Sequence, residues 1–328
     1  MASDAPILTV GPPPHWRGRS SITQMNYAFI VALVPAALVG ALSYGIVGDA
    51  ATAELGPAIT TKTKFLEVLL REFGLNAWFL SVSGALGILA LGAGLGMLVE
   101  YATQVIFRQP YEATNGHGLL MGLLLAMMMP PTVPWWVLVM GVIVTIVVGK
   151  QIFGGIGGYP FHPAMVGLLI LVLSWDKHLY PIDSIASMHW VVTMLIIAGG
   201  LTLAVLGHIR WQIPAGVIIG VLVMGAVFHG LNPTLAEGPL WQKMLMELVT
   251  GHVMLAAFFI ATDTTASPSK AVPMWIFGLL LGVLIMLIRV KGAWPDAVPF
   301  AVLLANVLSP LLDKIPWPPV KEVVIQNG

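Results

Sequence analysis

A broken stretch between two long apolar segments, KQIFGGIGGYPFHPAMVG at 150–167, limits how this chain can fold. Four of its first nine residues are glycine, which tolerates positive φ, and two prolines, which lack a backbone N–H, follow. A continuous helix therefore cannot cross it. Because lipid offers no hydrogen bonds to a backbone, such a break must be enclosed by protein or line a cavity. Broken membrane segments often hold ligands or ions, but a re-entrant hairpin that only packs also fits this pattern.

The composition around this break identifies the environment of the chain. Of its 328 residues, 58% are hydrophobic and 9% are charged, whereas soluble proteins average about 25% charged residues. A mean hydropathy of +0.90 predicts a multi-pass protein of the lipid bilayer. A net charge of zero leaves no basic patch for nucleic acid, and zero cysteines exclude thiolate metal sites and an iron–sulfur cluster ligated by this chain. No two of its eight histidines form a convincing pair of haem ligands, so we expect no haem.

Apolar runs and their interruptions predict about ten helical segments. Two of them, at 116–129 and 163–175, are shorter than the ~20 residues that a spanning helix needs. Each half of the chain repeats one order: a short segment starting at Gly-His, a break, a full span, a second break and a short helix. The longer runs lie at 25–46, 77–104, 135–153, 189–208, 211–228, 241–261 with an interruption near Gly251, and 273–290, and a short final run lies at 300–312.

Matching breaks in both halves are typical of membrane proteins built from structural repeats, with a site where the repeats meet. We therefore predict an all-α polytopic membrane protein of about ten transmembrane helical segments, in two repeated halves with broken or re-entrant helices. The predicted organisation is an N-terminal tail over 1–24, a single membrane domain over 25–313 with repeats at about 25–175 and 188–313, and a C-terminal tail over 314–328.

Ionisable residues within or beside apolar segments suggest function, because burying them in a membrane is costly. Asp263 lies in a polar break beside Thr264 and Thr265, and this hydroxyl–carboxylate cluster can hold Na⁺ or relay a proton. We predict an ion pathway there; a cluster that only caps the next helix is the alternative. Glu100 lies in a predicted span, and Arg289 is expected to extend to a membrane interface.

Several long motifs resemble the NqrB/RnfD family, and its RnfD members most closely. They are PHWRGRSSITQMNYAFIVALVPAAL, PPTVPWW, GKQIFGGIG and PAMVG in the first half, and FFIATDTTASPSK and IFGLLLGVLIMLIRVKGAWPDAVPFAVLLANVLSPLLD in the second. The resemblance implies an internally repeated ten-helix fold related to urea-transporter-like channels. It also implies a bacterial inner-membrane complex with other membrane and peripheral subunits, in which flavins carry electrons and Na⁺ or H⁺ moves.

Two departures from the family bear on the flavin. The family attaches FMN to threonine in an S-G-A-T motif, where this chain reads DSIAS at 183–187, so Ser187 replaces the threonine and Ile185 the glycine. A β-branched residue in that turn argues against modification, and we expect no covalent FMN on Ser187. Tyr159 and His162 stand where the family often has asparagine. The predicted non-covalent site for a flavin, riboflavin or FMN, comprises Gly154, Gly155, Gly157, Tyr159 and His162.

Three functions remain open on these observations. The chain is a redox subunit that supports flavin-mediated electron transfer coupled to Na⁺ or H⁺ movement, a non-redox ion or solute channel-like subunit, or a structural scaffold of a respiratory complex that has lost the flavin sites. Only the first requires a flavin anchor or pocket.

Overall fold

The computed structural model describes residues 21–54, 77–108, 113–130, 133–179, 190–231, 239–292 and 296–314. The longer elements in these ranges are helices. Two short π-helical turns adjoin them, η2 (Val144–Val148) and η5 (Ala256–Ile260), as do two 3-10 turns, η1 (Ala113–Asn115) and η3 (Gln151–Phe153). The helices are α1 (Ile22–Glu54), α3 (Ala77–Ile106), α4 (His117–Met127), α5 (Trp135–Ile143), α6 (Pro163–Leu179), α7 (Trp190–Val205), α8 (Gln212–Leu231), α9 (Leu240–Val249), α10 (Val253–Leu255), α11 (Ala271–Lys291) and α12 (Val298–Lys314).

The helices confirm an all-α, multi-pass membrane protein. Within the described ranges, five helical segments are long and apolar enough to cross a membrane, and α4 and α7 are shorter apolar helices. Their surfaces carry many exposed Leu, Val, Ile and Trp side chains, as a bilayer requires. The five long segments are Ile22–Ser43, Gly84–Ile106, Trp135–Phe153, Gln212–Leu231 and Ala271–Lys291.

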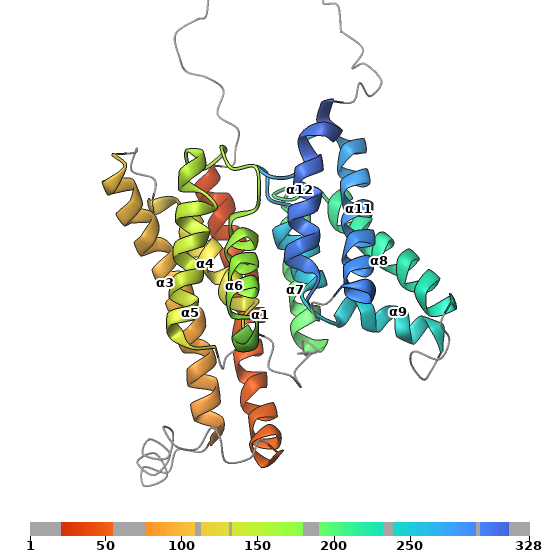
Figure 1. The fold of residues 1–328 in the computed structure, drawn as a ribbon, viewed down its shortest axis with the longest axis horizontal. Coiled ribbons are helices and arrows are strands. Elements are labelled where there is room, and N and C mark those ends of the chain that lie inside the picture. The colour runs from red at the N-terminus through yellow and green to blue at the C-terminus, as the bar shows by residue number, and fades with distance from the viewer. Residues whose placement is uncertain are drawn as a thin grey trace, which may run out of the picture.

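Two groups of helices lie side by side (Figure 1). The first contains α1, α3, α4, α5 and α6, and the second contains α7, α8, α9, α11 and α12. Contacts of α1 with α7 and of α6 with α12 join the two groups. The end of α12 lies at the same end of the molecule as the start of α1.

The breaks predicted from glycine and proline are present. No helix covers 154–162 or 261–270, and the predicted segment at 241–261 is divided into α9 and α10–η5 at Thr250–His252. Gly154, Gly155 and Gly157 have φ values of 95°, 92° and 87°, which side chains with a Cβ rarely adopt. Sequence therefore located these interruptions through the local backbone preference of each residue.

Small residues bring α3 and α4 into backbone contact. A Cβ added to Gly96 or Gly122 would clash with the carbonyl of Gly118 or Gly92 on the facing helix. Such close approach is typical of glycine-rich membrane helices, and α3 contains the glycine-rich sequence GALGILALGAGLG. The contact places Glu100 of α3 directly beside the start of α4.

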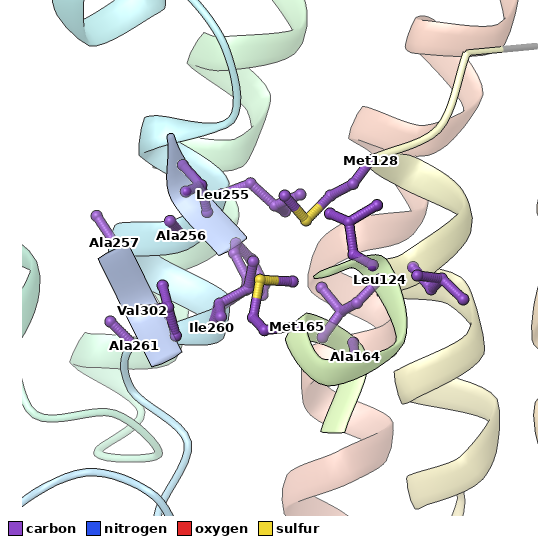
Figure 2. Packing of buried hydrophobic residues seen from close by; sticks show 14 of the residues in the cluster. Leu124, Met128, Ala164, Met165, Leu255, Ala256, Ala257, Ile260, Ala261 and Val302 are labelled. Atoms are coloured by element: carbon purple, nitrogen blue, oxygen red, sulfur yellow. The ribbon is translucent and has the colours of Figure 1, made fainter. Parts of the chain in front are cut away.

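An apolar core separates the two short helical segments α4 and α10–η5. Figure 2 shows Leu124 of α4, and Met128 just after it, facing Leu255 and Ile260, with Met165 of α6 between them. All five side chains are buried. Packed apolar side chains therefore fill the space between the two short segments, and polar groups that can act on a ligand or an ion lie at the ends of these segments.

Candidate functional site

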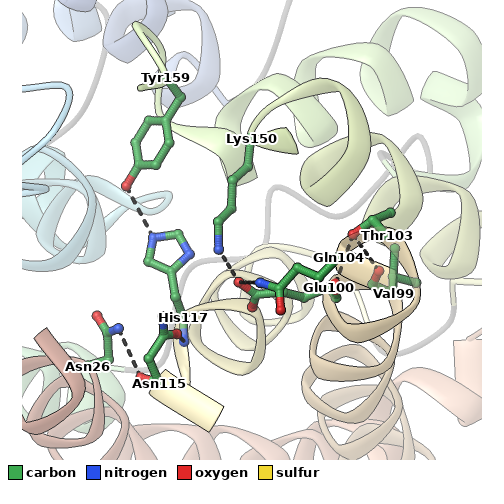
Figure 3. A network of polar contacts seen from close by, with 9 residues as sticks. All are labelled: Asn26, Val99, Glu100, Thr103, Gln104, Asn115, His117, Lys150 and Tyr159. Atoms are coloured by element: carbon green, nitrogen blue, oxygen red, sulfur yellow. Dashed lines mark hydrogen bonds and ion pairs between the residues drawn. The ribbon is translucent and has the colours of Figure 1, made fainter. Parts of the chain in front are cut away.

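A buried ion pair lies where α3, α4 and the turn after η2 meet (Figure 3). The Nζ of Lys150 contacts the Oε1 of Glu100, and the two side chains are 1% and 0% exposed. The Nε2 of Gln104, one turn further along α3, donates to the same carboxylate oxygen at 3.4 Å. The other carboxylate oxygen, Oε2, has no hydrogen-bond partner among the described residues. An ion pair enclosed this completely is costly to build, which suggests a role beyond packing.

A hydrogen-bonded chain connects the two groups of helices beside this pair. The hydroxyl of Tyr159 donates to the Oδ1 of Asp263 at 3.2 Å, and it lies 3.1 Å from the Nε2 of His117. Because the hydroxyl proton is directed to Asp263, His117 must donate through Nε2 in this arrangement. The chain thus runs from the start of α4, through the break at 154–162, to the break that follows η5.

The start of α4 is held in place from α1. The Oδ1 of Asn115 accepts the backbone N–H of His117 at 3.0 Å, and the Nδ2 of Asn26 donates to the carbonyl of Asn115 at 3.0 Å. Gly116 has a φ of 75°, which reverses the chain before the helix. The imidazole of His117 therefore projects from a turn that α1 and the α4 backbone both fix.

Asp263 lies between η5 and α11, outside the membrane-spanning helices. Burial raises the pKa of its carboxyl to about 6, while the hydrogen bond from Tyr159 and the positive charge of Lys150 favour the ionised form. The carbonyl of Asp263 accepts from the backbone N–H of Ser267 at 3.1 Å and from its Oγ at 2.7 Å, which closes the turn. A carboxyl that titrates near neutral pH, at one end of a hydrogen-bonded chain, is suited to proton exchange.

The glycines of the predicted cofactor site leave open space. A Cβ added to Gly154 or Gly157 would meet nothing within 4 Å, and both residues are exposed, whereas Gly155 is buried. Tyr159 is buried, with its hydroxyl already bonded at both sides. The break therefore presents exposed backbone at one edge, but no free ring face or unused hydroxyl from Tyr159.

His162 is enclosed and its imidazole lacks partners. The residue is 0% exposed, and neither ring nitrogen has a hydrogen-bond partner among the described residues. Its backbone N–H donates to the side-chain oxygen of Asn306 at 3.0 Å when the Asn306 amide is oriented to allow it. Both side-chain polar atoms of buried Gln151 also lack partners in the described chain. Buried groups of this kind ordinarily bind water or a ligand.

The remaining predicted residues are Ser187 and the two threonines after Asp263, of which Thr265 interacts with both Tyr159 and Asp263. Thr264 is exposed, and Thr265 is half-buried. Ser187, with the 183–187 loop, lies outside the described residues. The structure thus places Tyr159 and Asp263, which we predicted for a cofactor and an ion respectively, in one hydrogen-bonded chain.

Three residues of this polar site were not predicted to have a role: Glu100, Lys150 and His117. Glu100 carried a signal, since ionisable residues are rare in apolar spans. Lys150 begins the broken stretch and His117 belongs to the Gly-His start, but neither position indicates its partner. Glu100 and Lys150 are 50 residues apart, and only helix packing brings them together.

Comparison with known proteins gives one family. A family model described as the NQR2, RnfD, RnfE family matches residues 9–189 and 181–320. The D subunit of the ion-translocating oxidoreductase complex of Sodalis glossinidius is 30% identical over 305 residues, covering 72% of this chain and 87% of that protein. The D subunit of the proton-translocating ferredoxin:NAD(+) oxidoreductase complex of Clostridium ljungdahlii is 26% identical over 357 residues, covering 95% of each chain.

Proposed function

Because the chain belongs to the NQR2, RnfD, RnfE family, we propose that it is the D subunit of an ion-translocating oxidoreductase complex of the bacterial inner membrane. Its relatives carry that description, and its helices are those of a multi-pass membrane protein. Its partners in this proposal are the other membrane and peripheral subunits of the complex.

Within that complex, the hydrogen-bonded chain of His117, Tyr159 and Asp263 relays a proton. The observation that carries this proposal is the Tyr159 hydroxyl, which lies between an imidazole and a carboxyl and can pass a proton from one to the other. The buried charges of Glu100 and Lys150 adjoin this chain and bias the protonation of its members. Na⁺ held by Asp263, Thr264 and Thr265 is the competing assignment.

Co-isolation tests the assignment to this complex. The full-length chain, carrying an affinity tag and extracted from native membranes in mild detergent, is expected to bring down other polypeptides with electron-transfer activity. Isolation of the chain alone, or of an assembly without redox activity, would favour the channel-like or scaffold functions.

The proposed cofactor is a flavin, riboflavin or FMN, held without a covalent bond against Gly154, Gly155, Gly157 and His162. The open space beside Gly154 and Gly157 and the unpartnered imidazole of His162 fit such a ligand, whereas Tyr159 belongs to the relay. Bound flavin would supply one- and two-electron redox chemistry at this edge of the protein. In this proposal the glycine backbone approaches the ligand closely and the imidazole donates or accepts a hydrogen bond.

His162→Leu tests the flavin site. Extractable riboflavin or FMN per polypeptide is expected to fall in this variant, while assembly persists, because leucine removes the hydrogen-bonding imidazole but fills similar space. Tyr159→Phe is the matched control and should keep its flavin. In-gel fluorescence of the denatured wild-type chain should show no flavin band, in line with an unmodified Ser187. Flavin that is absent from the wild type, or unchanged in His162→Leu, would remove this site and favour the scaffold.

A further inference from the structure

Helix α9 presents its apolar side chains away from the protein. It begins after Pro239 and lies across the direction of α11 and α12, with its end beside α11 (Figure 1). Trp241, Leu245 and Met246 are 64%, 51% and 58% exposed. Gln242 is also exposed, but no charged residue shares this outward face, since Lys243 and Glu247 are the charged residues of α9 and both are partly buried.

The charged face of α9 is directed toward the protein instead. The Nη1 of Arg289 on α11 lies 2.6 Å from the Oε2 of Glu247, and the Nε2 of His229 on α8 lies 3.0 Å from its Oε1. The Nη2 of Arg289 donates to the carbonyl of Thr250 at 2.9 Å, just after α9 ends. The guanidinium of Arg289, a residue that we predicted to extend to a membrane interface, thus fastens α9 to α11.

A helix on a water-facing surface points its charges outward, whereas α9 directs its charged residues toward the protein and exposes large apolar side chains. Helix α8, which packs against α9, also exposes apolar side chains such as Val223 and Leu231, and it is one of the membrane-spanning helices. Trp241 is the residue type that concentrates at the boundary between lipid and water. A hydrocarbon environment stabilises such a face, which exposes large apolar side chains but no charge.

We propose that α9 lies in the interface of the bilayer, with Trp241, Leu245 and Met246 in contact with lipid acyl chains. The cluster of Glu247, Arg289 and His229 holds the helix against the membrane domain. The proposal depends on the membrane character of the chain and not on its role in an oxidoreductase complex.

Spin labels can test this placement because the chain contains no cysteine. Leu245→Cys carries the label on the outward face, Val223→Cys labels the lipid-facing side of α8, and Lys177→Cys labels an exposed polar position. The full-length chain, with the subunits that co-purify, is reconstituted into phospholipid vesicles. Collision rates of each label are then measured with oxygen, which enters lipid, and with a water-soluble nickel chelate.

The label at Leu245→Cys is expected to give an oxygen-to-nickel collision ratio several-fold above that of Lys177→Cys and no higher than that of Val223→Cys, because an interfacial helix lies less deep than the middle of α8. A ratio equal to that of Lys177→Cys would place α9 in water and overturn the proposal. Protection from both reagents would mean that another protein surface covers α9, and would also overturn it. Met246→Cys repeats the measurement on the same face, so a folding failure of one variant does not decide the result.

Discussion

The Lys150→Met variant is expected to lose about 3–5 kcal/mol of folding stability, because it leaves the carboxylate of Glu100 buried without its cation. Methionine fills most of the space of the lysine stem, so the loss reports the charge and not a cavity. Glu100 is 0% exposed, and its carboxylate lies against the backbone of Gly118, so it cannot move to water. The measurement is the unfolding free energy of the purified chain, obtained by titration with denaturant in mixed micelles.

The double variant Glu100→Gln/Lys150→Met is the matched control. It removes both charges, so it should recover most of the stability that the single variant loses. If Lys150→Met were as stable as the wild type, or the double variant no better than the single one, the pair would not be a buried ion pair.

Tyr159→Phe is expected to lower ion translocation by the complex about a hundredfold, the lower range for losing a positioned proton-transfer group. Phenylalanine preserves the ring but removes the one hydroxyl that joins His117 to Asp263. Substrate-driven proton movement into reconstituted vesicles, followed with a pH-sensitive dye, measures the effect. Electron transfer in uncoupled vesicles should persist, because the substitution interrupts the proton path and not the assembly.

Asp263→Asn separates a functional role from a structural one. The pKa of an aspartate in an unfolded chain is about 3.9, whereas burial raises the pKa of folded Asp263 to about 6. The native state therefore binds the proton more tightly than the unfolded state. Wild-type stability should therefore fall as pH rises from about 4 to about 6, where the folded carboxyl ionises and its burial becomes unfavourable. Asparagine stays neutral, so the variant should be more stable than the wild type above pH 6, with the difference vanishing toward pH 4.

The same Asp263→Asn variant should translocate protons as poorly as Tyr159→Phe. Greater stability together with lost translocation would identify a residue retained for function. Normal translocation in both variants would contradict the relay, and Na⁺-dependent translocation lost in Asp263→Asn alone would favour the cation site instead.

In both halves a histidine at the start of a short helix lies beside the break that leads into the last helix of that half, which supports the proposed repeats at about 25–175 and 188–313. In the first half, His117 at the start of α4 lies beside the break that leads into α6. In the second half, the Nδ1 of His252 at the start of α10 lies 2.6 Å from the Oδ2 of Asp296, in the break that leads into α12. Asp296 also accepts the backbone N–H of Val298 at 3.1 Å, so it caps α12 as well.

The sequence by itself determined the helical class, the membrane environment and the places where helices break. These properties are local, because hydropathy, glycine at positive φ and the missing N–H of proline act within a few residues. It also marked Tyr159, His162 and Asp263 as candidates for chemistry. The sequence did not reveal which residues these side chains contact. Arg289 shows the reason, since a basic side chain near a helix end is compatible both with lipid headgroups and with pairing to Glu247.

Only the tertiary structure decided which polar groups meet. Tyr159 and Asp263 are 104 residues apart, and each lies in a break whose position depends on the helices that flank it. The close contact of Gly96 with Gly118 sets how deeply α4 sits against α3, and thereby places His117 and Glu100 in one site. Such contacts depend on the shapes of whole helices and on the low dielectric between them, which no single stretch of sequence encodes.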